Sequence, residues 1–208
     1  MTFELTQEEG EYIVKLARRA VETYLKQGQV IGTPVDIPLK LKERCGVFVT
    51  INTKQGKHHQ LRGCIGFPHP TTMLAQAIIE SSISSATQDP RFMSMKAEEL
   101  DQVVFEVSVL TPPEIVGVEN PQDYCSKIEV GRDGLIVERT YCKGLLLPQV
   151  PVELRWNEET FLCECCVKAG LPPDSWLLKG TKVYRFQAII FEEASSNGKI
   201  KRKKISDA

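Results

Sequence analysis

Residues 103–110, with the sequence VVFEVSVL, constrain the fold most strongly, because they are typical of a β-strand. Successive strand side chains point to opposite faces, so one face of this strand is entirely Val and Phe. The other face carries Glu106 among apolar neighbours. A carboxylate in such a setting usually has a cationic partner, and Arg62 and Arg91 are the candidates. The alternative is an outer sheet face on which Glu106 meets solvent.

Helices and further strands are expected on both sides of this strand. A capping box at residues 6–9 predicts an amphipathic helix that ends near Gly28. Two more helices are predicted, one beginning near residue 71 or 72 and one over residues 156–169. Further strands are expected at residues 47–51, 60–67 and 182–193, and a hairpin is expected over residues 128–139 with its turn at residues 131–134. Short hairpins and segregated helices favour an α+β fold with a mainly antiparallel sheet and flanking helices.

The domain organisation follows from prolines and charge. We expect a single domain over residues 1–193, with a lobe boundary at the proline-rich residues 111–120. Two prolines interrupt the apolar residues 144–154, which predicts an extended buried segment rather than a central strand. Residues 194–208 are basic and lack apolar periodicity, so we expect a tail that is mobile or held at the surface.

The composition excludes several classes of protein. Lys plus Arg number 26 against 27 Asp plus Glu in 208 residues, which argues against a protein built mainly to coat nucleic acid or an anionic membrane. No apolar run reaches the ~18 residues that span a bilayer. The acidic N-terminus lacks the profile of a signal peptide, so we expect a cytoplasmic protein without a membrane partner.

The seven cysteines indicate packing rather than disulfides or metal. Their number is odd and no secretion signal accompanies them, so a disulfide framework is not expected. Cys163 and Cys166 form a Cys-x-x-Cys, but a zinc site needs two further ligands. A thioredoxin-like pair would stand at the start of a helix rather than within one. We therefore expect core packing, and predict neither a metal nor a cofactor.

Residues 61–66, LRGCIG, form the candidate site. They precede a helix start, where free backbone N–H groups and the helix dipole can bind an anion, and Arg62 adds a planar fork of donors. The glycine spacing fits neither a phosphate-binding loop nor a dinucleotide fingerprint. The alternative is that Gly63 and Gly66 only let the chain bend and neighbours pack closely.

Cys64 is a candidate nucleophile. A nearby arginine and a helix N-terminus both favour the thiolate, and the base could come from His58, His59 or His69. The alternative is a small residue wedged between glycines. Asp89 and Arg91 stand in a tight bend, where they can pair with each other or cap a helix.

These motifs, taken in order, resemble those of the AMMECR family, named for the AMME syndrome candidate gene product. The resemblance runs from about residue 5 to residue 193 through LRGCIG, DPRF, EVSVL, GRDGLIVE, LLLPQVPVE and CVKAGL. It implies an α+β fold with two unequal lobes and a mainly antiparallel sheet. It implies no reaction, because no activity is established for the family. Relatives encoded with Memo-like and radical-SAM proteins imply a link to such partners.

Three functions remain open at this point. The first is a small-molecule or anion site, or the active site of a thiol-dependent enzyme with Cys64 as catalytic residue. Its ligand-binding residues would be Arg62, Gly63, Gly66, Asp89, Arg91 and Glu106. The second is an interaction module in a transcription, repair or translation assembly, in which the basic tail touches nucleic acid. The third is a scaffold that acts with a Memo-like or radical-SAM partner.

Overall fold

The computed structural model describes residues 3–55 and 58–205, and the chain forms two compact units of unequal size. The larger unit comprises residues 1–110 and 189–203, and the smaller comprises residues 111–188 and 204–208. The break after Leu110 stands at the start of the proline-rich segment. None of the helices in the described ranges has the length and apolar character needed to cross a membrane.

Helices and two antiparallel sheets confirm the expected α+β class. The α-helices are α1 (Gln7–Gln27), α2 (Leu74–Thr87), α3 (Tyr124–Lys127), α4 (Gln149–Glu153) and α5 (Glu158–Lys168). The short 3₁₀ helices of the described residues are η1 (Leu39–Lys42), η2 (Ala97–Gln102), η3 (Pro121–Asp123) and η4 (Pro173–Leu177). The strands are β1 (Gly46–Gln55), β2 (His58–Phe67), β3 (Val103–Leu110), β4 (Glu114–Ile115), β5 (Gly134–Arg139), β6 (Cys142–Leu146), β7 (Lys182–Phe186), β8 (Ala188–Glu193) and β9 (Ile200–Lys203).

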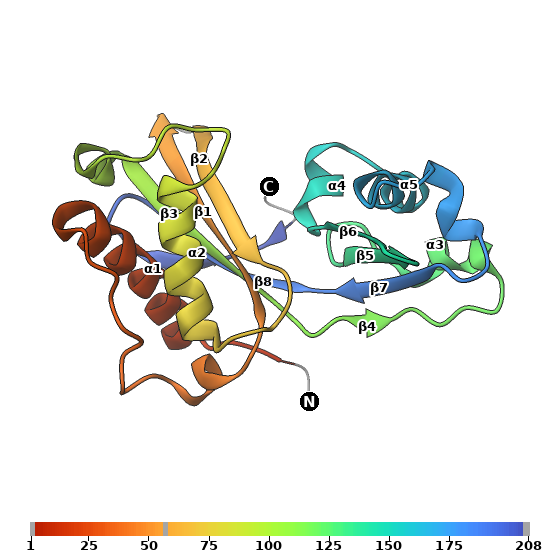
Figure 1. Cartoon of the computed structure of the whole chain (residues 1–208), viewed down its shortest axis with the longest axis horizontal. Helices are drawn as coiled ribbons and strands as arrows, with labels where there is room; N and C mark the ends of the chain where they lie inside the picture. The colour runs from red at the N-terminus through yellow and green to blue at the C-terminus, as the bar shows by residue number, and fades with distance from the viewer. Residues whose placement is uncertain (1–2, 56–57, 206–208) are drawn as a thin grey trace. The chain divides into compact units, whose positions relative to one another are not determined.

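The larger unit is a five-stranded sheet, in the order β2-β1-β3-β8-β9, with α1 and α2 packed on one face (Figure 1). The predicted capping box forms at Thr6 and Glu9, and Gly28 ends α1 in the left-handed conformation. Apolar side chains of alternate strand residues meet the two helices, among them Val49 and Phe105, both fully buried. Burial of this face is the main source of the unit's stability.

The smaller unit is a four-stranded sheet, in the order β4-β7-β5-β6, with its own core against α5. Cys165 and Cys166 are buried in that core, as expected for packing residues. Burial raises the pKa of the Cys165 thiol to about 12 and that of Cys166 to about 11. These thiols therefore remain protonated and unreactive at neutral pH.

The expectation of an extended segment over residues 144–154 is wrong. Strand β6 ends at Leu146, and the helix α4 follows directly. Pro148 stands at the N-cap of α4 and Pro151 lies in its first turn. Neither proline disrupts the helix, because the first N–H groups of a helix have no intrahelical partner to lose.

The expected last strand over residues 182–193 is two strands in different sheets. β7 pairs with β5 in the smaller unit, whereas β8 pairs with β9 in the larger one. Between them, the Gln187 backbone is bonded to Thr111: its N–H donates to the Thr111 hydroxyl and its carbonyl accepts the Thr111 N–H. The chain leaves one sheet here and joins the other.

The basic C-terminal segment contributes a strand, where the sequence suggests only a tail. β9 pairs antiparallel with β8, with Ile200 opposite Glu193 and Lys203 opposite Ile190. Ile200 is 4% exposed and belongs to the core, and this single apolar side chain is too weak a signal for periodicity. Residues 206–208 lie outside the described residues.

Candidate functional site

Two candidate side chains, Cys64 and Glu106, stand on either side of Thr50 on the face of the five-stranded sheet opposite α1 and α2. Thr50 on β1 is paired with Cys64 on β2 and with Glu106 on β3, so the three side chains share one face. The Thr50 hydroxyl lies 3.3 Å from the Cys64 sulfur. We call this surface the polar face, and it also carries Glu192 from β8 and Lys203 from β9.

The Cys64 thiol is half-buried and protonated at neutral pH. Its pKa is raised, chiefly by burial and further by the carboxylates of Glu106 and Asp89, against the opposing effects of the Thr50 hydroxyl and Arg91. A protonated thiol is a weak nucleophile and a hydrogen-bond donor. The electrostatics thus work against the thiolate that the sequence suggests.

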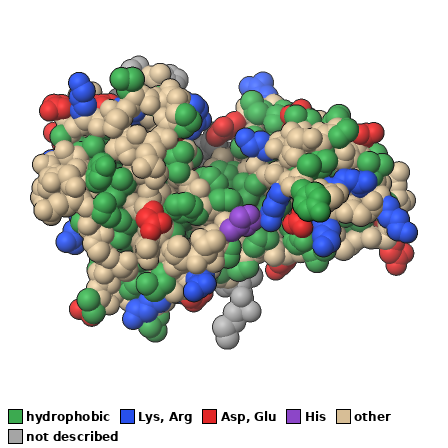
Figure 2. Space-filling model, viewed as in Figure 1, with side chains coloured by type: hydrophobic (Ala, Val, Ile, Leu, Met, Phe, Trp, Pro, Cys, Tyr) green, Lys and Arg blue, Asp and Glu red, His purple; other side chains and the backbone are tan. Residues whose placement is uncertain are grey.

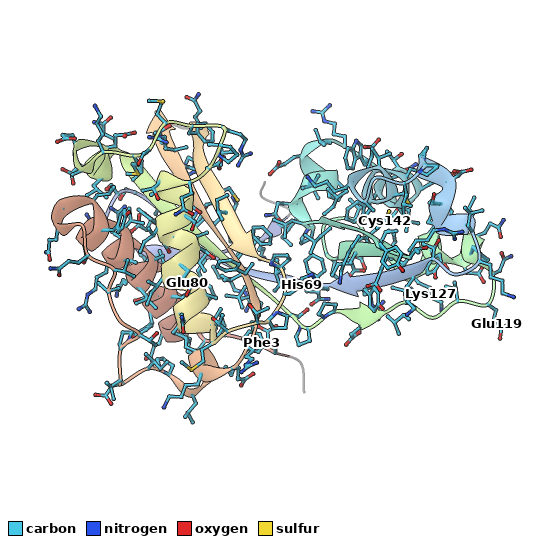
Figure 3. All side chains as sticks on the ribbon, viewed as in Figure 1. Phe3, His69, Glu80, Glu119, Lys127 and Cys142 are labelled. Atoms are coloured by element: carbon cyan, nitrogen blue, oxygen red, sulfur yellow. The ribbon has the colours of Figure 1, made fainter. Side chains whose placement is uncertain are left out.

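The described histidines do not stand next to this thiol as a base. His59 lies five residues before Cys64 on the same strand, which at ~3.3 Å per residue is about 17 Å. His69 is exposed in the loop between β2 and α2, where Figure 3 labels it. The side chain of His58 lies outside what the structure describes. These histidines could act as a general base for Cys64 only if the chain adopted a different conformation.

The two glycines lie within β2 rather than in a turn, and packing accounts for both. A Cβ at Gly63 would overlap the backbone oxygen of Ser85 on α2, and a Cβ at Gly66 would overlap the Phe48 ring. Because α2 comes this close, the Ser85 hydroxyl accepts the Ile65 N–H at 2.8 Å. A ligand-binding role for the glycines remains a prediction, and close approach is sufficient to explain them.

Helix α2 also begins later than expected, at Leu74, with Met73 as N-cap. The Leu74 N–H donates to the Glu43 carbonyl at 2.8 Å, so one of the first N–H groups of the helix is already bonded. Pro68 and Pro70 lie in the loop that separates β2 from this terminus. The glycines therefore do not form a turn directly before the helix N-terminus, and an anion site at this place stays a prediction.

Arg62 is held by Glu99 on η2. Its Nε and Nη2 donate to the two Glu99 oxygens at 2.8 and 3.1 Å, and Nη2 also donates to the Met93 carbonyl at 2.9 Å. The hydrogen bonds from Arg62 lower the pKa of the Glu99 carboxyl. A bidentate pair of this kind occupies the donor fork that we expected to be available for an anion.

Asp89 and Arg91 pair with each other and together hold the backbone of Cys64. An Arg91 Nη2 lies 2.7 Å from Asp89 Oδ2, and the same oxygen accepts the Cys64 N–H at 2.8 Å. These bonds, those from Arg91 first, place the pKa of the Asp89 carboxyl far below its usual range. Arg91 Nη2 also lies 3.5 Å from the Cys64 carbonyl. The pair thus satisfies the outer edge of β2 at the candidate cysteine.

The partner of Glu106 is Lys203, not Arg62 or Arg91. The Lys203 ammonium lies 2.8 Å from Glu106 Oε2 and 3.6 Å from Glu192 Oε2. Nor does Glu106 face solvent, since its side chain is 8% exposed. Burial acts to lower the pKa of Lys203, but the two carboxylates outweigh it and the pKa is raised.

The sequence did not mark two residues of this group, Thr50 and Lys203, as site residues. Thr50 could have been found from the alternation of its strand, which opposes it to the apolar neighbours Val49 and Ile51. Lys203 stands in a run of basic residues, and a charge run gives no sign that one member is paired within a sheet. The sequence therefore identified Cys64 and Glu106 on this face, but it did not identify Thr50 or Lys203.

The polar face can bind a molecule by hydrogen bonds and charge. It offers a thiol donor, a hydroxyl and two carboxylates around one ammonium group. Within residues 3–55 and 58–205, no group of three or more His, Cys, Asp or Glu side chains is arranged to hold a metal ion.

Comparison with known proteins gives a consistent match over nearly the whole chain. A model of the AMMECR1 family matches residues 14–191. Protein PH0010 of Pyrococcus horikoshii is 56% identical over 204 residues, which cover 98% of each chain. Protein MJ0810 of Methanocaldococcus jannaschii is 48% identical over 201 residues, 97% of this chain and 98% of its own. The crystal structure of the uncharacterised PH0010 aligns with a TM-score of 0.89, covering 97% of this chain and 100% of that chain.

Proposed function

Because the chain belongs to the AMMECR1 family, and the related crystal structure is of an uncharacterised protein, we propose a function from the geometry of the polar face. We propose that this face binds a small polar molecule beside Cys64. The thiol acts as a hydrogen-bond donor to that molecule rather than as a thiolate nucleophile. The Thr50 hydroxyl and the Glu106 carboxylate stand on the two neighbouring strands to share in the binding.

One observation carries this proposal: two polar side chains are buried on the interior strand β3, beside the partly buried Thr50 and Cys64. Glu106 is 6% exposed and Ser108 is 1% exposed, although both belong to a strand whose other face is wholly apolar. Buried polar groups cost free energy unless they are satisfied, and apolar residues of similar size would serve stability at least as well. A binding role explains why a thiol, a hydroxyl and a carboxylate stand side by side there.

Anion binding is less well supported than binding of a neutral or cationic molecule. Each cation that the sequence suggested for an anion already has a carboxylate partner, Glu99 for Arg62 and Asp89 for Arg91. Lys203 is likewise shared by Glu106 and Glu192. An anion would have to displace one of these carboxylates from its partner.

A nucleic-acid role for the C-terminal segment is also less well supported, because three of its five basic residues, Lys201, Arg202 and Lys203, form ion pairs within the chain. Lys201 pairs with Glu192 at 3.2 Å and Arg202 pairs with Glu4 at 3.0 Å. On the larger unit, Figure 2 shows Lys and Arg side chains interspersed with Asp and Glu, without a broad field of positive charge on the visible side. Binding to a phosphate backbone requires such a field.

The proposal is tested by the alkylation rate of Cys64. Iodoacetamide labelling, resolved by peptide mass spectrometry, is followed while three classes of small molecule are added: amines, anions and neutral polyols. We expect one class to change the Cys64 rate at millimolar concentration, while the half-buried Cys142 of the smaller unit serves as the internal control.

The variant Thr50→Val sharpens this test, because it removes the hydroxyl with little change of shape. It should weaken the effect of the ligand on Cys64 several-fold, whereas Thr53→Val on the same strand should leave it unchanged. If no class alters the Cys64 rate, or if all accessible cysteines respond equally, the polar face is not a small-molecule site.

A further inference from the structure

The Lys203 ammonium group is itself seated as a ligand would be on the polar face. It lies 2.8 Å from Glu106 Oε2 and 3.6 Å from Glu192 Oε2. The two carboxylate side chains are each 8% exposed, whereas the lysine side chain is 25% exposed. The carboxylates thus form the buried wall of the contact, and the ammonium approaches them from the more open side.

Lys203 lies on β9, the strand of this sheet with the fewest stabilising contacts. β9 has four residues, pairs with β8 alone, and has one buried apolar side chain, Ile200. The Gln7 side chain on α1 also donates a hydrogen bond to the Ile200 carbonyl at 2.9 Å. The ion pairs of Lys201 and Arg202 involve side chains that are 59% and 49% exposed. Exposed ion pairs contribute little and weaken with salt, so we expect β9 to separate from the sheet more readily than the other strands do.

The two carboxylates would then lack their principal cation. Arg62 and Arg91 are committed to other acids, as described above, and Lys201 contacts only the far carboxylate, Glu192, at 3.2 Å. Glu106 would remain as a nearly buried negative charge beside the Thr50 hydroxyl and the Cys64 thiol. Such a charge strongly favours a replacement cation.

We propose that the small molecule bound on the polar face carries an ammonium or guanidinium group, and that this group takes the place of Lys203 between Glu106 and Glu192. This inference rests on the proposed function and names its ligand class. The hydroxyl of Thr50 and the thiol of Cys64 then bind the neutral polar part of the molecule. Strand β9 acts as an internal competitor, so the free protein keeps its carboxylates paired until the ligand arrives.

The experiment is an NMR titration of the full-length protein, followed at the backbone amides of Thr50, Cys64 and β9. The cationic probes are methylammonium, putrescine and arginine, compared with acetate, phosphate and glycerol at matched ionic strength. The three cations should shift the Thr50 and Cys64 amides, and hydrogen exchange of the β9 amides should accelerate while the amides of β1 and β3 stay protected.

The variant Lys203→Met removes the internal competitor and keeps the length of the side chain. Its apparent affinity for the amines should rise by about tenfold, which corresponds to ~1.4 kcal/mol. Lys201→Met, on the same face of the same strand, is the matched control and should change the affinity less than about twofold. Glu106→Gln combined with Lys203→Met leaves no lone buried charge, so it should fold well and lose the gain.

Three results overturn the inference. If acetate, phosphate or glycerol shifts Thr50 and Cys64 while the amines do not, the site stands and the ligand class is wrong. If no probe shifts these amides, both the site and the inference fail. If Lys203→Met binds amines no better than Lys201→Met, Lys203 is a structural partner only. If Lys203→Met does not fold, the wild-type exchange of β9 decides: no acceleration with amines contradicts displacement.

Discussion

Each face of the five-stranded sheet carries a buried carboxylate with a cationic partner, but the two pairs are built differently. On the face against α1, Arg18 donates two parallel hydrogen bonds to Glu193, from Nε to Oε1 at 2.6 Å and from Nη2 to Oε2 at 2.5 Å. Both side chains are nearly fully buried, at 5% and 3% exposed. On the polar face, Lys203 makes one short contact to Glu106 and is a quarter exposed.

The difference lies in how completely each network is satisfied. Arg18 also donates to the carbonyls of Leu100 and Val103 at 3.1 and 2.8 Å, and its guanidinium lies 4.7 Å from the centre of the Phe105 ring. Glu193 accepts the Phe105 N–H as well. A complete network is fixed and specifies the fold, whereas an ammonium shared between two acids leaves room for exchange.

Breaking the complete network should have the largest effect. Arg18→Met leaves Glu193 as an unpaired buried charge, so we expect the free energy of unfolding to fall by about 3–5 kcal/mol. Urea denaturation at pH 7 measures it. The double variant Arg18→Met with Glu193→Gln should lose clearly less than the single variant, because it leaves no lone charge. Equal losses would show that packing rather than charge is responsible.

The close approach of α2 to β2 should rank second. Gly63→Ala places a methyl group against the Ser85 backbone, which must move, and we expect a loss of about 1–3 kcal/mol. Gly32→Ala is the control, since a Cβ there meets no atom within 4 Å and the position should be neutral. If the two variants unfold at the same urea concentration, the glycine at position 63 is not needed for packing.

The hydrogen bond from the Cys64 N–H to the Asp89 carboxylate should make the stability of the protein depend on pH in a definite direction. The pKa of Asp89 is lowered in the folded protein, so its contribution is present above the unfolded value of ~3.9 and is lost as the pH falls further, toward the folded pKa. We expect Asp89→Asn to cost about 1–2 kcal/mol at pH 7. Chemical denaturation at pH 7 and pH 3 should show the wild-type advantage shrinking, and the exposed Asp36→Asn should show no such change. An advantage that is constant with pH would contradict this assignment.

The local features of this fold are the ones that could be predicted from the sequence. The capping box of α1, the alternation of β3 and the packing of Cys165 each depend on residues within one element. The α+β class follows because those elements and their order are local signals too. The prediction for residues 144–154 was wrong, because proline is disfavoured inside a strand but tolerated in the first turn of a helix.

The partners of charged residues could not be predicted, because tertiary contacts choose them. Glu106 and Lys203 are 97 residues apart in sequence, and nothing local marks one for the other. The sequence grouped Asp89 and Arg91 with Cys64 and the structure brings these three into contact, whereas Arg62 is held by Glu99. Spacing in the sequence predicts a contact between two residues of one bend, such as Asp89 and Arg91. It does not predict which side chains pair across a sheet.

The smallest expected effect tests whether Glu106 acts on the thiol at all. The charge of Glu106 contributes to the raised pKa of Cys64, so Glu106→Gln should lower that pKa toward its ordinary value. More thiolate then forms at pH 8, and we expect iodoacetamide to label Cys64 about two- to threefold faster. Glu192→Gln is the matched control, because it removes a carboxylate from the same face without belonging to the groups that shift Cys64. A rate that is unchanged in Glu106→Gln would mean that the charge of Glu106 does not act on the Cys64 thiol. The polar face would then be an ion pair and a separate thiol rather than one site.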